Sequence, residues 1–263
     1  MKLSYQIIVL FFSLFVIGSN ANAAESIPYE LQGIGIEEKL GTHIPLDLVF
    51  KDEQGKEVKL QEYFKPNKPV IITMVYYGCP NLCGFLLNGF TDSLKEFAWS
   101  PGKEFEILTI SIDPTEGPEL AQGKKDSVLA AYGRAGVEKG WHFLTGSDEA
   151  SKKLSQALGF NYRYDEDQKQ YAHSAAIFVI TPDGKISRYL YGIQFAVRDL
   201  KLSLMEATQG KIGNVVDKLL LFCFHYDPKG RKYALMATNI MKIGGAVMVL
   251  FMAIFFIRQL RTR

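Results

Sequence analysis

Two cysteines, Cys79 and Cys83, lie four positions apart in the stretch YYGCPNLCGFLLN, directly after an apolar run. Such a pair supports three kinds of chemistry: a structural disulfide, thiol–disulfide exchange, or a clamp for a metal ion. A local disulfide stabilises little, because the entropic gain from closing a loop grows with the length of the loop. Exchange and metal binding are therefore favoured, and both use the thiolate, whose formation a helix N-terminus promotes.

The apolar pattern places the two cysteines at a turn from a strand to a helix. The run KPVIITMVYY is typical of a buried central strand, and Pro80 followed by apolar residues at helical spacing predicts a helix. A first hairpin is predicted around Gln54-Gly55 and a second around Pro182-Asp183-Gly184. Further strands are expected over 105–112 and 141–146, and further helices over 119–135, 148–158, 195–208 and 212–224. This order predicts an α/β domain with a thioredoxin-like fold and an N-terminal β-hairpin extension.

A distant histidine and the cysteine spacing favour metal over exchange. Three residues separate the cysteines, whereas redox enzymes of this fold favour two. His173 opens the strand pattern SAAIFVI, at a position where those enzymes usually have a proline facing the dithiol. Two thiolates and an imidazole suit Cu(I), imidazole also suits Cu(II), and a structural zinc site would take a fourth protein ligand. Taken alone, His173 is a strand-end histidine that only packs; it becomes a ligand if the fold brings it to Cys79 and Cys83.

At this point the sequence resembles the SCO/SenC family of thioredoxin-like copper-binding proteins for cytochrome c oxidase assembly. The resemblance runs from about Thr42 to Thr208 and is carried by IPLDLVFKDEQGKEVKLQEYF, CPNLC, TISIDP, FLTG and HSAAIFVITPDGKISRYLYG. It implies that Cys79, Cys83 and His173 are the copper ligands. It also implies a role in delivering copper to the binuclear copper centre of an oxidase subunit, or in preparing the thiols of that centre. After Asp113-Pro114 the family often has a further acidic residue and a threonine, where this chain has TEGPE.

Both ends of the chain predict export and a membrane anchor. Lys2, the apolar run Ile7 to Ile17 and Ala21-Asn22-Ala23 form a signal peptide pattern, with an uncleaved N-terminal anchor as the alternative. Ile243 to Ile257 carries no charge, and the apolar stretch reaches back to Ala234, with Asn239 and Lys242 near its edge; residues 234–257 are long enough to cross a bilayer of ~30 Å at ~1.5 Å per residue. Because arginines follow directly, the C-terminus is expected in the cytoplasm and the domain on the periplasmic side of the cell membrane.

These patterns divide the chain of 263 residues into six parts. They are a signal peptide (1–23), an extended leader (24–41), the copper-binding domain (42–210), a juxtamembrane segment (211–233), a transmembrane helix (234–257) and a cytoplasmic tail (258–263). The formal charge of +2, with no basic stripe interleaved with aromatic residues, argues against nucleic acid as a partner. The expected partners are the copper-centre subunit of the oxidase, a copper donor or thiol reductant, and the membrane.

Other candidate residues carry weaker signals. Cys223 and His225 precede the predicted span and are either an accessory copper or redox site or, as we favour, a buried thiol beside a surface histidine. His43 and His142 have no cysteine neighbours, which indicates surface or packing roles. Asp113-Pro114 is expected to shape the loop beside the site. The acidic run from Asp165 to Asp167 is interpreted as a solvated loop rather than a contact for a basic partner.

The leading hypothesis is therefore a membrane-anchored copper metallochaperone. The second is a thiol–disulfide oxidoreductase, in which Cys79 attacks and Cys83 resolves the mixed disulfide, keeping the oxidase cysteines reduced. A third, weaker hypothesis is a peroxide-reducing or redox-sensing protein, for which no particular residue argues.

Overall fold

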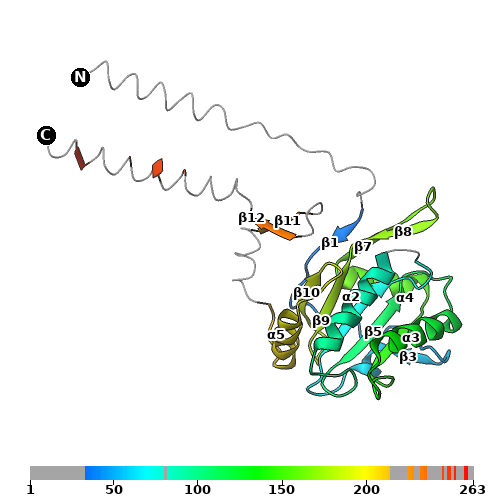
Figure 1. Ribbon diagram of the computed structural model, residues 1–263. Helices are drawn as coiled ribbons and strands as arrows, with labels where there is room; N and C mark the ends of the chain where they lie inside the picture. The colour runs from blue at the N-terminus through cyan, green and yellow to red at the C-terminus, as the bar shows by residue number, and fades with distance from the viewer. Residues whose placement is uncertain are drawn as a thin grey trace.

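Figure 1 shows the computed structural model of the chain. The structure describes residues 33–79, 82–213, 224–227 and 232–235, together with positions 245, 248, 249, 252, 258 and 259. For residues 82, 83, 224–227 and 232–235 it describes the backbone alone.

The described elements alternate between strands and helices in the way that the sequence predicts. In chain order they are β1 (Gly35–Ile36), β2 (Val49–Lys51), β3 (Glu57–Lys59), the 3-10 helix η2 (Leu60–Tyr63), β4 (Val70–Val75), α2 (Leu82–Glu96), β5 (Glu106–Ser111), α3 (Pro118–Tyr132), β6 (Trp141–Leu144), α4 (Asp148–Ala157), β7 (Phe160–Asp165), β8 (Gln170–His173), β9 (Ala176–Ile180), β10 (Ile186–Tyr191), α5 (Val197–Thr208), β11 (Phe224–Asp227) and β12 (Lys232–Leu235).

The core is a five-stranded sheet in the order β10-β9-β4-β5-β6. Strands β4, β5 and β6 are parallel, and β9 runs antiparallel to both β4 and β10. Every residue of β4, β5 and β9 is buried, as expected for strands whose residues are mostly β-branched and apolar rather than alternating; in β5 the exceptions to this composition are Glu106 and Ser111, at its two ends. The sheet confirms the predicted central strand and the predicted hairpin of β9 and β10.

Helices α2, α3 and α5 lie together against one face of this sheet (Figure 1). The connections from β4 through α2 to β5 and from β5 through α3 to β6 step across the sheet in one direction, so right-handed crossovers place both helices on one face. A cluster of rings fills the space beneath α2, where Phe90 makes edge contacts with Trp141 and Phe195. Gly89 lets α2 approach the loop before α5, because a Cβ there would lie 1.8 Å from the carbonyl oxygen of Ile193.

Two smaller sheets extend the core. Strands β2 and β3 form the predicted N-terminal hairpin around Gln54-Gly55, with Val49 paired to Lys59. A second small sheet, in the order β1-β7-β8, was not predicted. It draws part of the predicted extended leader into the fold, since Gly35 in β1 pairs with Asn161 in β7.

The C-terminal predictions fall mostly outside the described residues. The expected helix over 212–224 is wrong at both described ends, because Ile212 and Gly213 are irregular and Phe224 begins β11. The chain after α5 is held extended along β10 instead, since the Gly213 N–H donates to the Ser187 carbonyl (2.9 Å). β11 pairs with β12, so the predicted juxtamembrane segment contains a strand pair, and β12 includes Ala234 and Leu235 of the predicted span.

The signal peptide (1–23) and most of the predicted transmembrane helix (234–257) also lie outside the described residues. Within the residues that are described, none of the helices has the length and apolar character needed to cross a membrane.

Candidate functional site

The cysteine loop leaves the sheet at the carboxyl end of β4. The backbone turns immediately after the strand, and the Cys79 N–H faces the Tyr76 carbonyl oxygen at 3.3 Å. Cys79 is half-buried and packs against the edge of the core. Helix α2 begins at Leu82, so the backbone of Cys83 lies in its first turn, where the helix dipole favours a thiolate.

His173 lies at this same end of the sheet. It ends β8, two residues before β9, and β9 pairs antiparallel with β4 so that Thr73 faces Ile177. Continuing this register toward the carboxyl end of β4 carries the chain from Ile177 back toward His173. The imidazole ring lies edge-on to Tyr76, with centroids 6.2 Å apart, only three residues before Cys79. The fold therefore brings His173 to Tyr76, at the start of the cysteine loop, while its assignment as a ligand beside Cys79 and Cys83 stays a prediction.

The surroundings of His173 select one neutral form of the imidazole. The residue is only 8% exposed, and Nδ1 lies 2.8 Å from the carbonyl oxygen of Ser174. A carbonyl oxygen can only accept, so Nδ1 carries the proton and the lone pair is on Nε2. Burial lowers the pKa of His173, against a smaller opposite effect of the Ser174 carbonyl. The ring is thus neutral at pH 7 and has the tautomer in which Nε2 can bind a metal ion.

The complete ligand set remains a prediction. Among the side chains that the structure describes, no three of the types His, Cys, Asp and Glu gather closely enough to hold a metal ion. The Cys83 side chain is not among them. The donor chemistry nevertheless fits copper, because the half-buried Cys79 and the buried, neutral His173 lie at the same end of the sheet, next to the helix turn that carries Cys83.

Two tyrosines that the sequence analysis did not single out fix the start of this loop. Successive residues of an extended chain point to opposite sides, and Tyr76 and Tyr77 do so here. Tyr76 packs on Tyr171 (centroids 5.5 Å apart) and on His173. The Tyr77 hydroxyl lies 2.8 Å from the Thr109 carbonyl and 2.7 Å from the Leu144 carbonyl, and its ring packs on Phe143. In the sequence, the two adjacent tyrosines between the strand and the first cysteine could have indicated that rings hold this loop.

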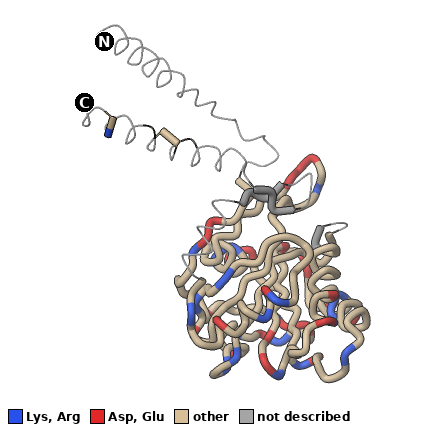
Figure 2. The backbone as a smooth tube through the Cα atoms, turned by 60° about the vertical axis from the view of Figure 1, so that its left-hand side comes forward, with Lys and Arg blue, Asp and Glu red and all other residues tan. Residues whose placement is uncertain are grey.

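The β7–β8 hairpin forms the wall beside His173. Rings contact one another along it, with Tyr171 against both Tyr162 and Tyr164. Burial, followed by the charge of Asp113, raises the pKa of Tyr171 to about 12. Tyr171 therefore stays protonated, and the loop after β5 lies within electrostatic reach of the site. The tip of the hairpin projects from the domain (Figure 2) and carries the exposed acidic residues Glu166 and Asp167, consistent with the predicted solvated loop.

The loop after β5 confirms the shaping role expected for Asp113-Pro114. The Asp113 N–H donates to Ser111 Oγ (3.1 Å), and its carboxylate accepts from Thr115 through both the backbone N–H and the hydroxyl (2.8 and 2.7 Å). The next residue, Glu116, reaches the cysteine loop itself. The sequence analysis named Glu116 only within TEGPE, where this chain departs from the family pattern, and assigned it no role.

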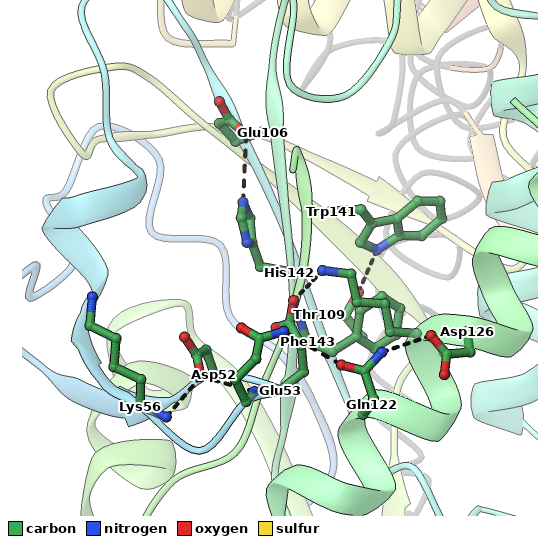
Figure 3. Close-up of polar contacts among 12 residues, drawn as sticks. Asp52, Glu53, Lys56, Glu106, Thr109, Gln122, Asp126, Trp141, His142 and Phe143 are labelled. Carbon is green, nitrogen blue, oxygen red and sulfur yellow. Dashed lines mark hydrogen bonds and ion pairs between the residues drawn. The ribbon is translucent and has the colours of Figure 1, made fainter. Parts of the chain in front are cut away.

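The remaining histidines lie away from the site. His142 is on β6 and packs against Tyr63 (centroids 4.4 Å apart), with Nε2 3.7 Å from the buried carboxylate of Glu106 (Figure 3). His43 Nδ1 lies 3.2 Å from the Asp183 carbonyl at the β9–β10 turn. Both agree with the predicted packing or surface roles. Cys223 lies outside the described residues and only the backbone of His225, in β11, is described, so their roles stay predictions.

Comparison with known proteins decides the family. The sequence model of SCO1/SenC matches residues 37–209, more than half of the chain. The chain belongs to the SCO1/SenC family. The SCO1 protein homolog of Bacillus subtilis (strain 168) is 23% identical over 147 residues, which cover 55% of this chain and 72% of the relative.

Solved structures share the fold. A putative electron transfer protein from Aquifex aeolicus VF5 has a TM-score of 0.56 at 25% identity, covering 65% of this chain and 95% of that one. BsSco, a member of the Sco family of cytochrome c oxidase assembly proteins in which a disulfide switch was identified, has a TM-score of 0.50 at 18% identity, covering 67% and 99%. ScoI of Arabidopsis thaliana, crystallised with copper bound, has a TM-score of 0.49 at 20% identity, covering 65% and 98%. The family match and the two structures with TM-scores of 0.56 and 0.50 confirm the predicted thioredoxin-like α/β domain of this SCO1/SenC chain.

Proposed function

We propose that this SCO1/SenC chain holds one copper ion between Cys79, Cys83 and His173 and delivers it to the copper centre of cytochrome c oxidase. The observation that carries the proposal is the position of His173, a neutral imidazole at the same sheet end as the cysteine loop and in ring contact with Tyr76. Copper bound to ScoI and oxidase assembly as the role of the Sco family support the choice of cargo and recipient.

Each residue would have a defined part in holding the cargo. The thiolates of Cys79 and Cys83 match a soft ion such as Cu(I), and His173 Nε2 adds a donor that also suits Cu(II). Three protein ligands leave room for an incoming thiolate of the recipient. Transfer would then proceed by ligand exchange, in which each bond from copper to the recipient replaces one to this chain. The buried ring of Tyr76 and the half-buried ring of Tyr171 limit access of water on the histidine side.

The same proposal includes the membrane. A signal peptide over 1–23 and a transmembrane helix over 234–257 would place the domain on the periplasmic side, where the copper centre is assembled. Arg258, Arg261 and Arg263 would keep the tail in the cytoplasm. A copper donor or a thiol reductant would be the second partner, since only the dithiol form binds copper.

A second candidate function is thiol–disulfide exchange, supported by a cysteine pair at the strand-to-helix turn of a thioredoxin-like fold. The Cys79 thiolate would attack a substrate disulfide and release one substrate thiolate. Cys83 would then displace the second, which leaves the substrate reduced and a Cys79–Cys83 disulfide in this chain. A thiol reductant would have to supply two electrons to reset it.

The test is a Cu(I) titration of the reduced full chain against a competing chelator, without oxygen. The variants are Cys79→Ser, Cys83→Ser and His173→Ala, and Cys223→Ser is the matched control for loss of a thiol. We expect one tight equivalent in the unaltered chain and in the control, and affinity at least ~100-fold weaker in the other three, which corresponds to about 2.7 kcal/mol.

Binding that is indifferent to His173 would overturn the ligand assignment. Weak copper binding by the unaltered chain, together with multiple turnovers on a disulfide substrate, would favour thiol–disulfide exchange as the function instead.

A further inference from the structure

The carboxylate of Glu116 binds the backbone of the cysteine loop. Oε2 accepts from the Tyr77 N–H (2.7 Å) and Oε1 accepts from the Gly78 N–H (2.6 Å), the two peptide groups directly before Cys79. Oε2 also accepts from the Ser111 hydroxyl (2.6 Å). Hydrogen bonds to an ionised carboxylate are about twice as strong as bonds between neutral groups, so Glu116 restrains the backbone of the loop strongly.

The neighbouring residues are arranged to bring Glu116 to this position. It follows the turn built on Asp113, and its own N–H donates to the Asp113 carbonyl (3.2 Å). Ser111, the last residue of β5, lies beside Val75, the last residue of β4, because the two strands are parallel and in register. Glu116 therefore links the loops that leave two adjacent strands.

Gly78 makes the close approach possible. A Cβ at this position would lie 3.3 Å from Glu116 Oε1, a contact tighter than side chains usually tolerate. A glycine directly before the first cysteine is thus matched to a carboxylate that comes from a loop more than thirty residues away.

We infer that Glu116 is a positioning residue for the Cys79 site: it holds the Tyr77–Gly78 backbone so that the Cys79 thiol is presented in one place, without itself binding the ion. The inference rests on the proposed copper function, which gives the position of Cys79 its importance. A loop fixed before binding loses less conformational freedom when the ion arrives. Groups that orient metal ligands in this way typically account for ~10–100-fold in affinity.

Two substitutions distinguish a positioning role of Glu116 from a role of its negative charge. Glu116→Gln keeps the shape of the side chain but puts an NH₂ group against one of the two peptide N–H donors. Glu116→Asp keeps the charge but is one methylene too short to reach both peptide groups. A purely electrostatic role would be lost in the glutamine variant and kept in the aspartate variant, whereas a positioning role is impaired in both.

Glu53→Gln is the matched control. The Glu53 carboxylate also accepts a backbone N–H, from Phe143 (3.3 Å; Figure 3), and is paired with Lys125, but its described hydrogen bonds do not reach the backbone of the cysteine loop. This variant is expected to lower stability and leave copper affinity unchanged.

The experiment measures Cu(I) affinity by chelator competition, the thermal unfolding midpoint, and the rate at which oxidised glutathione converts the two thiols to the Cys79–Cys83 disulfide, all on the full chain. We expect both Glu116 variants to bind copper ~10–100-fold more weakly and to close the disulfide ~10-fold more slowly, with Glu53→Gln unchanged in both. Should Glu116→Gln fail to fold, Ser111→Ala, which removes one of the three bonds, takes its place with an expected loss of about threefold, on the order of 0.7 kcal/mol.

The outcomes distinguish this inference from the proposed function. If the unaltered chain binds no copper tightly, the copper function fails, and slower disulfide closure in the Glu116 variants alone would still support the positioning role. If the unaltered chain binds copper and both Glu116 variants match it in affinity and closure rate, the positioning role is wrong. An effect in the glutamine variant alone would replace positioning with electrostatics.

Discussion

The two ends of the central sheet each hold a histidine, and the two histidines have different surroundings. At the carboxyl end of β4, His173 faces rings and a carbonyl oxygen, and the adjoining loop carries a thiol. At the other end, His142 faces the carboxylate of Glu106, the first residue of β5, which is fully buried and paired with Lys65 (3.1 Å) and Lys68 (3.6 Å). One end presents neutral or soft donors, while the other is closed by ion pairs.

This contrast suggests that one end of the domain serves ligand binding and the other serves stability. A soft metal ion needs donors that are deprotonated or neutral, and in the proposed function Cys79, Cys83 and His173 would supply them. At that end the carboxylate of Glu116 is held by backbone N–H groups of the cysteine loop. The opposite end can use charge for stability because it has no ligand to bind in the proposed function.

The largest expected effect tests the ion-pair end. Lys125 and Glu53 are both buried and in direct contact, so Lys125→Met leaves a buried carboxylate without its cation. We expect a loss of about 3–5 kcal/mol in the free energy of unfolding, measured by urea denaturation, with copper affinity unchanged in the folded protein. The double variant Glu53→Gln with Lys125→Met should recover part of the loss. A single-variant loss below about 1 kcal/mol would mean that this end contributes little to stability.

The second prediction compares the two histidines directly. His173→Ala and His142→Ala each remove one mostly buried imidazole and should lower stability by similar amounts, about 1–3 kcal/mol. Only His173→Ala should reduce Cu(I) affinity, by ~100-fold or more, about 2.7 kcal/mol. Parallel urea denaturation and chelator competition on both variants check this. If the two variants bind Cu(I) with equal affinity, the proposed difference between the two ends of the sheet is wrong.

Much of this contrast could be predicted from the sequence, because it depends on strong local patterns. The buried run of β4, the helix after Cys79 and the β9–β10 hairpin all follow from apolar periodicity and turn residues. The relation of His173 to the cysteines followed from expecting a thioredoxin-like fold rather than from any local signal. The β7–β8 hairpin that ends at His173 was missed because its strands mix tyrosines with charged residues and show no clean alternation.

The polar contacts could not be predicted, because they join residues far apart in the chain. Nothing in the sequence pairs Glu116 with Tyr77, or Glu106 with His142; parallel strand register does so. Glu106 was expected only as part of a buried strand, and its charge is tolerated because Lys65 and Lys68, from the loop before β4, reach it.

A third prediction concerns acid stability, which should depend on the ion-pair end. Burial raises the pKa of Glu53, but Lys125 and backbone N–H groups outweigh it; burial likewise raises that of Glu106, but His142 and Lys65 outweigh it. Both pKa values therefore lie below 4.5 in the folded chain. The unfolded chain binds protons first as the pH falls below about 5, so stability is present above that pH and is lost toward the lower folded pKa values.

Urea denaturation between pH 7 and pH 3 measures this effect. Each carboxyl adds at most about 1.4 kcal/mol per pH unit to the slope, and Glu53→Gln and Glu106→Gln should each make the slope shallower. Slopes unchanged in both ion-pair variants would show that acid sensitivity arises elsewhere.

The smallest effect on stability is expected from Tyr77→Phe. This variant tests whether the Tyr77 hydroxyl helps to fix the position of the cysteine loop. Burial, and then the charge of Glu116, raises the pKa of Tyr77 well above 10, so the hydroxyl stays a donor. It has one hydrogen for two carbonyl oxygens, at Thr109 and Leu144, and its loss should lower the free energy of unfolding by about 1 kcal/mol. Chelator competition should show Cu(I) affinity within about threefold of the unaltered chain, roughly 0.7 kcal/mol, because the backbone N–H of residue 77 still binds Glu116. If affinity instead falls as far as in Glu116→Gln, the hydroxyl beneath the loop, and not only the carboxylate beside it, positions Cys79.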